Sequence, residues 1–343
     1  MSPVVPAPNF DHLLRLSDET GLLEHAERAT PRRSHGYCLD DVARGLVVLA
    51  REPDPPAVLR RLLERYLAFV RHAQDNSGAF HNRLSYHRRW QDTPGTGDWW
   101  GRALWGLGTV AARGTSPWLR DEALTCFESG ARQRSPWLRA MAFATLGAAE
   151  VLTRHPGHEA ARALLKAGAG CAARPSPDPR WPWPEPRLEY ANAVLAETLL
   201  VAGRHGNDDS LVNDGLHLLN WLLRTETRDG HLSLTPAGGW RPPQPRPVFD
   251  QQPIEAAALA DACAQAAALT ADTRWAAGVA RCVSWFTGDN DVRVPMMDAG
   301  TGGGFDGLTR TGVNLNQGAE STMALLTTLQ HGRELGGVPL LGE

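Results

Sequence analysis

Repetition is the feature of this 343-residue sequence that most restricts its fold. Six segments open with polar or aromatic residues and continue as small, apolar residues at helical spacing, as in GDWWGRALWGLGTVAA. The six segments begin at His35, Gly97, Ser135, Leu188, Phe249 and Asn316. They recur roughly every 40 to 65 residues, a period typical of helical repeats. We therefore expect six equivalent helical units.

The segments between these repeats have a different character, because they carry Arg or Glu on one face and apolar residues on the other. They cover residues 56–74, 116–133, 157–173, 210–226 and 274–286, and an opening helix over residues 10–27 completes the set. The Ala- and Gly-rich repeats suit buried inner helices, and the charged segments suit an outer layer. The pattern predicts an all-α fold, an (α/α)6 toroid of six inner and six outer helices, as a single domain over residues 1–343. An open solenoid is the alternative, and six units in one compact length favour closure.

Composition and charge exclude several classes of function. The formal net charge is −3 without a basic patch, so no nucleic-acid partner is expected. No run of about 18 apolar residues occurs, so no membrane span is expected. The five cysteines form no CxxC pair and no secretory signal is recognisable, so we expect free thiols and a cytoplasmic protein. No metal or cofactor is expected, and the oligomeric state is left open.

The starts of the inner helices are the expected functional site, because parallel inner helices of a closed barrel begin at one mouth. The residues expected to bind substrate there are His35, Tyr37, Asp40, Trp99, Trp100, Arg102, Arg139, Glu189, Asn192, Gln252, Asn316 and Gln317, joined by Trp181 and Asp306 from loops. Tryptophan and tyrosine stack on sugar rings, and carboxylates, amides and arginine bind sugar hydroxyls. The same polar residues also cap helices, so each of them taken alone has a structural explanation.

Carboxyl groups at these positions are the candidates for chemistry. Glycoside hydrolysis needs one carboxyl group that protonates the leaving oxygen and a second that activates water or attacks the sugar. The candidates are Asp41, Asp98, Asp250, Glu255 and Glu320. Asp40 and Asp41 are adjacent on a helix and point roughly 100° apart, so one of them can bind sugar while the other does chemistry. Which carboxyl group is acid and which is base stays open, and a glycine-rich loop that contains Asp306 is expected to cover the cleft.

Five motifs, HGYCLDDVARGL, GDWWGRALWGLG, RAMAFATLG, FDQQPIEAAALADA and GVNLNQGAEST, give the chain a family resemblance. It resembles the six-hairpin toroid carbohydrate-active enzymes, and in particular a mostly uncharacterised bacterial family found with, or labelled as, glycosyltransferases. The resemblance implies the toroid fold and an activity among inverting hydrolases, polysaccharide lyases, epimerases and phosphorylases. The sequence lacks the strand–helix alternation of a nucleotide-binding fold, so the glycosyltransferase label is not adopted.

Three functions follow as hypotheses. The first is a glycoside hydrolase that cleaves an oligosaccharide, with inversion implied by the resemblance. The second is a sugar epimerase or polysaccharide lyase, for which His35 and Tyr37 would remove a carbon-bound proton. The third is a non-catalytic glycan-binding protein, which would keep the aromatic residues and tolerate loss of the carboxylates.

Overall fold

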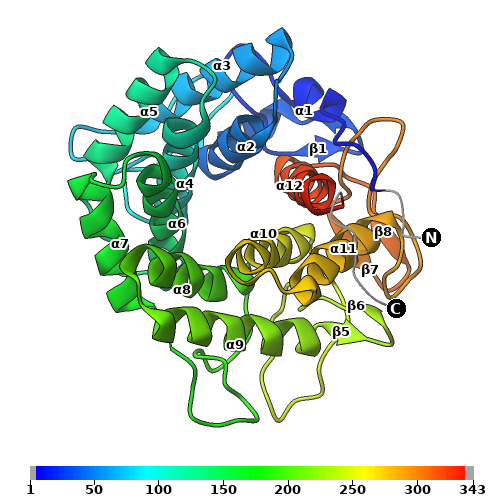
Figure 1. The fold of residues 1–343 in the computed structure, drawn as a ribbon. Coiled ribbons are helices and arrows are strands. Elements are labelled where there is room, and N and C mark those ends of the chain that lie inside the picture. The colour runs from blue at the N-terminus through cyan, green and yellow to red at the C-terminus, as the bar shows by residue number, and fades with distance from the viewer. Residues whose placement is uncertain (1–4, 173, 337–343) are drawn as a thin grey trace.

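The computed structural model describes residues 5–172 and 174–336, and its twelve α-helices form two concentric rings (Figure 1). The inner ring consists of α2 (Leu39–Arg51), α4 (Asp98–Arg113), α6 (Leu138–Arg154), α8 (Ala193–Gly206), α10 (Pro253–Thr270) and α12 (Ala319–Leu335). The outer ring consists of α1 (Asp11–Leu16), α3 (Ala57–Ala73), α5 (Pro117–Gly130), α7 (Glu159–Cys171), α9 (Asp209–Thr225) and α11 (Thr273–Thr287). The predicted (α/α)6 toroid is confirmed.

The inner ring closes on itself. Each inner helix contacts both of its neighbours, and the last inner helix, α12, packs against the first, α2. The starts of α2, α4 and α12 line one cavity, whereas later residues of the same helices line a second cavity. The inner helices therefore run in the same direction, with an N-terminal mouth at one end of the toroid and a C-terminal mouth at the other. None of the helices in the described ranges could cross a membrane, being either too short or too polar.

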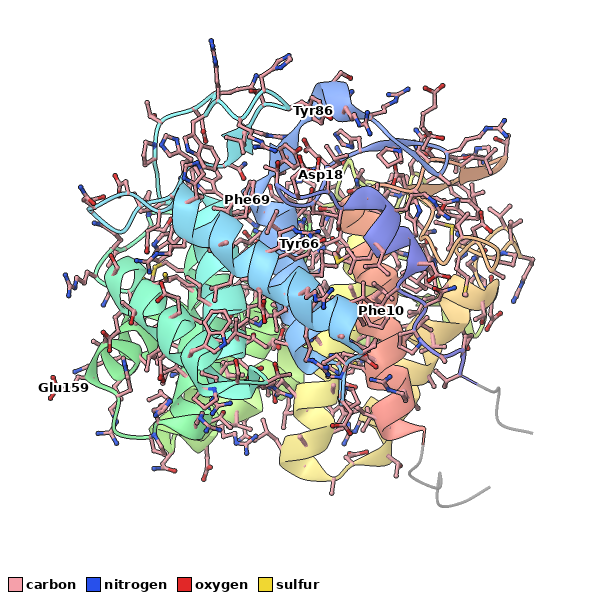
Figure 2. All side chains as sticks on the ribbon, turned by 90° about the horizontal axis from the view of Figure 1, so that it is seen from above. Phe10, Asp18, Tyr66, Phe69, Tyr86 and Glu159 are labelled. Atoms are coloured by element: carbon pink, nitrogen blue, oxygen red, sulfur yellow. The ribbon has the colours of Figure 1, made fainter. Side chains whose placement is uncertain are left out.

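Short antiparallel strand pairs lie in the segments that connect the helices. The pairs are β1 (Ala26–Glu27) with β2 (Thr30–Pro31), β3 (Tyr37–Cys38) with β4 (Arg83–Leu84), β5 (Thr227–Arg228) with β6 (His231–Leu232), and β7 (Gly307–Thr309) with β8 (Gly312–Asn314). A short 3-10 helix, η1 (Arg33–His35), precedes β3. In the side view of Figure 2, Asp18 and Tyr86 mark the end where the inner helices begin. The antiparallel pairing of β3 with β4 connects the start of α2 to the loop that precedes α4.

The opening helix is shorter than predicted, because α1 ends at Leu16 rather than near residue 27. Ser17 is extended, and the Asp18 carboxylate accepts hydrogen bonds from the backbone N–H groups of Thr20 and Gly21. Such a local turn competes with helix continuation. The residues that follow form β1 and β2 and bring Glu24 and His25 to the N-terminal mouth.

Glycine permits the close approach of α4 and α6. A Cβ atom on Gly108 would lie 2.2 Å from the carbonyl oxygen of Gly147, and one on Gly147 would lie 2.2 Å from that of Leu104. Neither contact is possible with a real side chain, so the two backbones can touch only because both residues are glycine. The small residues of the repeats therefore set the diameter of the inner ring.

Replacing Gly108 by alanine should destabilise the protein by about 1–3 kcal/mol, because α4 and α6 must separate to admit the methyl group. Chemical denaturation measures this change. The matched control is Gly170→Ala in α7, where no heavy atom lies within 4 Å of the new Cβ. That variant should gain up to about 1 kcal/mol from helix propensity. Equal effects of the two substitutions would contradict the close-packing explanation.

Candidate active site

Two adjoining cavities occupy the N-terminal mouth. The first, called the acid cavity, has a volume of 480 Å³, and the second, called the aromatic cavity, has a volume of 770 Å³. Asp98 and Trp99 line both cavities. The acid cavity also receives Asp40, Asp41, Gln252, Asp306 and Glu320 among the residues predicted from sequence, and the aromatic cavity receives Arg139 and Glu189. The mouth therefore brings together residues from segments far apart in the chain.

Arg44 organises the carboxylates of the acid cavity. Its Nη1 donates to Asp41 Oδ1 at 2.5 Å, and its Nη2 lies 2.8 Å from Asp40 Oδ2 and 2.7 Å from Glu320 Oε2. Asp40 also pairs with Arg102, whose Nε lies 2.8 Å from Asp40 Oδ1 without hydrogen-bond alignment. The Arg44 side chain is nearly buried, and its contact with Glu320 joins α2 to α12. One arginine thus holds three carboxylates from both sides of the ring closure.

Burial raises the pKa values of two carboxyl groups of the acid cavity. Burial raises the pKa of Asp41 to about 8, against the opposing effect of Arg44 and with a further increase from Asp40. Burial also raises the pKa of Asp98, against the opposing charge of Arg102. Groups with raised pKa values beside ionised partners are a common arrangement for acid–base chemistry.

Asp98 differs from the other acids because its carboxylate is unpartnered. None of the described residues forms a hydrogen bond or an ion pair with it, and only through-space charges oppose the effect of burial. The N-cap of α4 is Gly97, so Asp98 is the first helical residue rather than the capping side chain considered for it. Next to it, Trp99 is fixed by a hydrogen bond of 2.8 Å from Nε1 to the Phe80 carbonyl. Asp98 is therefore the carboxyl group available to a ligand at the junction of the cavities.

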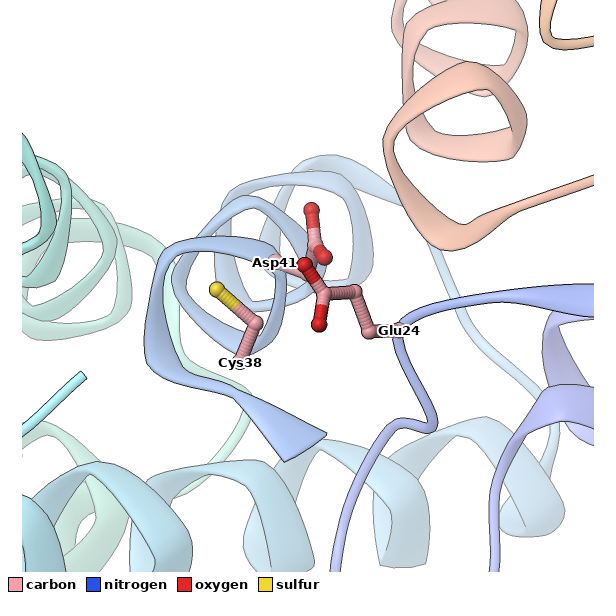
Figure 3. Close-up of side chains that lie close together, drawn as sticks. All are labelled: Glu24, Cys38 and Asp41. Atoms are coloured by element: carbon pink, nitrogen blue, oxygen red, sulfur yellow. The ribbon is translucent and has the colours of Figure 1, made fainter. Parts of the chain in front are cut away.

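Glu24, Cys38 and Asp41 form a compact cluster at the back of the acid cavity (Figure 3). One potential ligand atom from each lies within 4.8 Å of the others. Metal binding would need a thiolate, yet burial and the neighbouring carboxylates raise the pKa of Cys38 well above its usual value. Glu24 is already paired with Arg83, and Asp41 with Arg44. These contacts fit a structural acid cluster better than a metal centre.

The aromatic cavity offers a flat apolar surface beside polar groups. The Trp137 ring lines it and is 65% exposed, which is unusual for so large an apolar side chain. Arg139 forms two hydrogen bonds with Glu185, at 2.8 and 2.9 Å, and its Nε donates to the Tyr190 carbonyl at 2.6 Å. Arg139 therefore builds the cavity wall, and Trp137 is free to stack on a ligand.

Two of the predicted site residues, Glu255 and Asn192, have a structural role instead. Glu255 accepts hydrogen bonds from the backbone N–H of Ala191 and from the backbone and side chain of Asn192. Both side chains are buried at the start of α8. Burial raises the pKa of Glu255 to about 8, and nearby Glu226 adds to the rise, so its shift has a structural origin. The expectation that Glu255 is catalytic is corrected to a cap contributed by α10.

Three further predicted binding residues are buried away from the cavities. Trp100 is fully buried and its Nε1 donates to the Gly130 carbonyl at 3.2 Å. Tyr37 donates its hydroxyl hydrogen to Asp18 at 2.6 Å and packs beneath the mouth. Gln317 exchanges hydrogen bonds with Thr301 and Asp298. These side chains support the scaffold and the loops, and the expectation that they touch substrate is corrected.

Other predicted residues lie outside the two cavities. Asp250 and His35 are solvent-exposed, and His35 packs edge-on against His25. Asn316 accepts a hydrogen bond from the Arg28 backbone, and Trp181 packs against Trp221 and Trp240. Arg102 lines the narrow lumen beneath the acid cavity, with its guanidinium over the Phe143 ring. Asp306 accepts hydrogen bonds from Gly318 and Ser321, so it caps α12 while lining the cavity.

Sequence reasoning missed several residues of the mouth. They are Glu24, His25, Arg44, Asn82, Arg83 and Glu185. Arg44 had a usable signal, because it follows Asp40 and Asp41 by four and three residues on one helix, a spacing that pairs opposite charges. The others come from loops and from strand β4, whose approach to the helix ends has no periodic signal.

Comparisons with known proteins support the fold. No protein-family model matches the chain, and no curated protein sequence matches it significantly. A sugar epimerase from a ruminal bacterium matches with a TM-score of 0.72 and 11% identity over 94% of this chain and 95% of the other. D-mannose isomerase matches with a TM-score of 0.69 and 13% identity over 94% of both chains. A cellulase from C. cellulolyticium in complex with cellobiose matches with a TM-score of 0.62 and 8% identity over 93% of this chain and 88% of the other. At these identities the likeness establishes the (α/α)6 toroid fold alone.

Replacing Glu255 by alanine should destabilise the protein by about 1–3 kcal/mol, because the buried N–H groups at the start of α8 lose their acceptor. Chemical denaturation measures the loss. Glu64→Ala on the exposed face of α3 is the matched control and should change stability by less than about 0.5 kcal/mol. An unchanged stability of the Glu255 variant would contradict the capping role.

Proposed function

We propose that this protein is a carbohydrate-active enzyme that hydrolyses a glycosidic bond of an oligosaccharide at the N-terminal mouth, with inversion. Asp98 is the general acid and Glu320 is the general base. The observation that carries the proposal is the unpartnered Asp98 carboxyl group, which has a raised pKa and lies where the acid and aromatic cavities meet.

The composition of the two cavities supports a sugar substrate. An exposed indole beside carboxylates, amides and arginines matches a molecule whose rings have apolar faces and whose edges carry hydroxyl groups. The acid cavity of 480 Å³ and the aromatic cavity of 770 Å³ each fall in the range of about 300–1,000 Å³ that holds a drug-sized ligand. Together they offer room for more than one sugar ring. Proteins named as sugar epimerase, mannose isomerase and cellulase share this fold, which adds support for a carbohydrate substrate.

The two carboxyl groups have environments suited to opposite roles. Burial favours the protonated form of Asp98, which can donate its proton to the glycosidic oxygen as the bond to the sugar carbon breaks. Glu320 is paired with Arg44, and its side chain is 40% exposed. It can therefore accept a proton from a water molecule that attacks the same carbon from the other face. The water oxygen replaces the leaving oxygen, and each carboxyl group returns to its starting state when protons exchange with solvent.

Inversion requires room for a water molecule between base and sugar. Asp98 and Glu320 begin α4 and α12, the two inner helices that flank α2. In inverting enzymes the two carboxyl groups are about 6.5–9.5 Å apart. Asp40 and Arg44 lie between them on α2 and keep the acid cavity polar. We therefore propose water activation by Glu320, which predicts a separation in this range between the Asp98 and Glu320 carboxyl groups.

Substitution of either carboxyl group should reduce hydrolysis of a cleaved oligosaccharide by about 10²- to 10⁴-fold in kcat. Asp98→Asn and Glu320→Gln keep the side-chain shape, and product formation is followed by NMR, which also reports anomeric configuration. Asp98→Asn should retain more activity on an aryl glycoside with an acidic leaving group, because that group needs no protonation. The rate of the unaltered enzyme should fall at high pH as Asp98 loses its proton, since burial raises the pKa of that group.

The control for these variants is Asp229→Asn, at a carboxylate that is 82% exposed. It should leave kcat unchanged. A product of retained configuration would contradict Glu320 as a general base. Full activity of both Asp98→Asn and Glu320→Gln would contradict the assignment altogether, and saturable sugar binding without any turnover would favour a glycan-binding protein.

A sugar epimerase or isomerase is the second candidate, and His25 is the observation that favours it. Its imidazole lines the acid cavity, 3.6 Å from Glu24. It replaces His35 and Tyr37, the proton-abstracting pair expected from sequence, since one lies outside the cavities and the other is buried. An epimerase would exchange a carbon-bound hydrogen with solvent during turnover.

Incubation of free sugars with the enzyme in D₂O separates the two candidates. Under the hydrolase proposal, His25→Gln should reduce oligosaccharide hydrolysis less than tenfold, and the unaltered protein should add no deuterium to sugar carbon. Mass spectrometry measures the incorporation. Deuterium uptake by the unaltered protein that disappears in His25→Gln would overturn hydrolysis in favour of epimerisation.

A further inference from the structure

A separate cavity of 440 Å³ lies at the C-terminal mouth, opposite the candidate active site. Every inner helix contributes at least one charged or titratable residue to its lining, and α12 contributes Glu334 as a second. Taken one from each helix in ring order, they are Arg51, Arg113, Glu150, Glu197, Asp261 and His331. Alanines of α10, among them Ala264, and Leu335 supply an apolar wall. The cavity is therefore a lined concave site of ligand size rather than a gap between helix ends.

All but one of these six groups are paired within the cavity. Arg51 and His331 lie 2.6 and 2.7 Å from Asp261 Oδ1, and Arg113 lies 3.1 Å from Glu150. Glu197 is the exception. The residue is 3% exposed, and its carboxylate has no hydrogen-bond or ion-pair partner among the residues that the structure describes.

The unpartnered carboxylate is costly to the empty protein. A buried charge without a partner is strongly disfavoured, so the group keeps its proton instead. Burial raises the pKa of Glu197 well above its usual value, and the negative charge of Asp261 adds to the rise while Arg51 opposes it. A glutamine of the same shape would avoid this cost, which indicates that a charged partner for the carboxylate is missing.

The charges around the cavity indicate which kind of ligand would pair with the Glu197 carboxylate. The inner helices direct their carbonyl ends toward this mouth, where the helix dipoles favour a positive charge. The cations that line the cavity already have carboxylate partners, so the unmet requirement at Glu197 is for a hydrogen-bond donor that carries positive charge. The alanine wall suits a methylene chain, and Glu334 lines the same cavity and is 52% exposed.

We propose that the C-terminal-mouth cavity is a second ligand site that binds a small aliphatic diamine. One ammonium group donates to the Glu197 carboxylate, the methylene chain lies on the alanine wall, and the second ammonium group reaches Glu334. A narrow space of 40 Å³, lined by residues that include Trp105, Phe143 and Met323, lies between this cavity and the acid cavity. It shares Glu197 and Asp261 with the C-terminal-mouth cavity and Arg44 and Glu320 with the acid cavity. The diamine site is thus distinct from the sugar site and does not depend on the proposed hydrolysis.

Titration calorimetry of the full chain with butane-1,4-diamine tests the proposal, with butane-1,4-diol as the uncharged probe of equal length. The diamine should bind and the diol should not. Affinity should rise with pH, because binding displaces the proton of Glu197. The groups that face this carboxyl group are Asp261, Arg51 and Glu150, with His331 and Arg113 further along the wall.

Glu197→Gln should weaken diamine binding about 10- to 100-fold, in line with the loss of a charged hydrogen bond. The same variant should be at least as stable as the unaltered protein at neutral pH, since it removes the carboxyl group whose pKa is raised. Glu19→Gln, at an exposed surface carboxylate, is the control and should change neither quantity. If Glu197→Gln fails to fold, Ala264→Leu, which fills the cavity from its wall, should abolish binding instead.

Three results would overturn the proposal. The diol could bind as tightly as the diamine, which would make the cavity a polyol site. Glu197→Gln or Ala264→Leu could bind the diamine with unchanged affinity, which would place the ligand elsewhere. Absence of any heat of binding with millimolar diamine would show that the cavity takes no diamine.

Discussion

The parallel direction of the six inner helices is the constraint on which the rest of the structure depends. It gives the toroid two chemically opposite ends, because helix N-termini carry partial positive charge and C-termini carry partial negative charge. Carboxylates gather at the N-terminal mouth, whereas Arg51, Arg113 and His331 lie at the other mouth together with acidic partners such as Asp261 and Glu150. Closure of the ring makes both mouths into lined cavities, and the contact from Arg44 on α2 to Glu320 on α12 joins the first and last inner helices at the site itself.

Arginine contacts keep the buried acids of the N-terminal mouth stable. Arg44 and Arg102 compensate Asp40, Asp41 and Glu320, so the cost of burying these charges is offset by direct contacts. Asp98 receives no such contact and keeps a raised pKa. Under the proposed mechanism, uneven compensation among neighbouring carboxyl groups would separate a proton donor from a proton acceptor within one cavity.

Sequence periodicity was sufficient to predict the helical rings, their closure and the mouth at which polar residues gather. It could not predict which face of each helix start points into the cavity, as Trp99 and Trp100 illustrate, because adjacent residues differ by about 100° around the helix. The sequence also hides the structural role of Glu255, because its partners Ala191 and Asn192 lie far away in the chain, just before α8. His25 and Glu24 reach the mouth only because the Asp18 turn ends the first helix early.

We propose that substrate binds across the junction of the acid and aromatic cavities. A crystal structure of the Asp98→Asn variant with an intact oligosaccharide would locate the substrate. We expect a glycosidic oxygen about 3 Å from the side chain of residue 98, one sugar ring on Trp137 and a water molecule held by Glu320. An oligosaccharide bound at the C-terminal mouth or on the outer surface, with the N-terminal mouth empty, would disprove this binding mode.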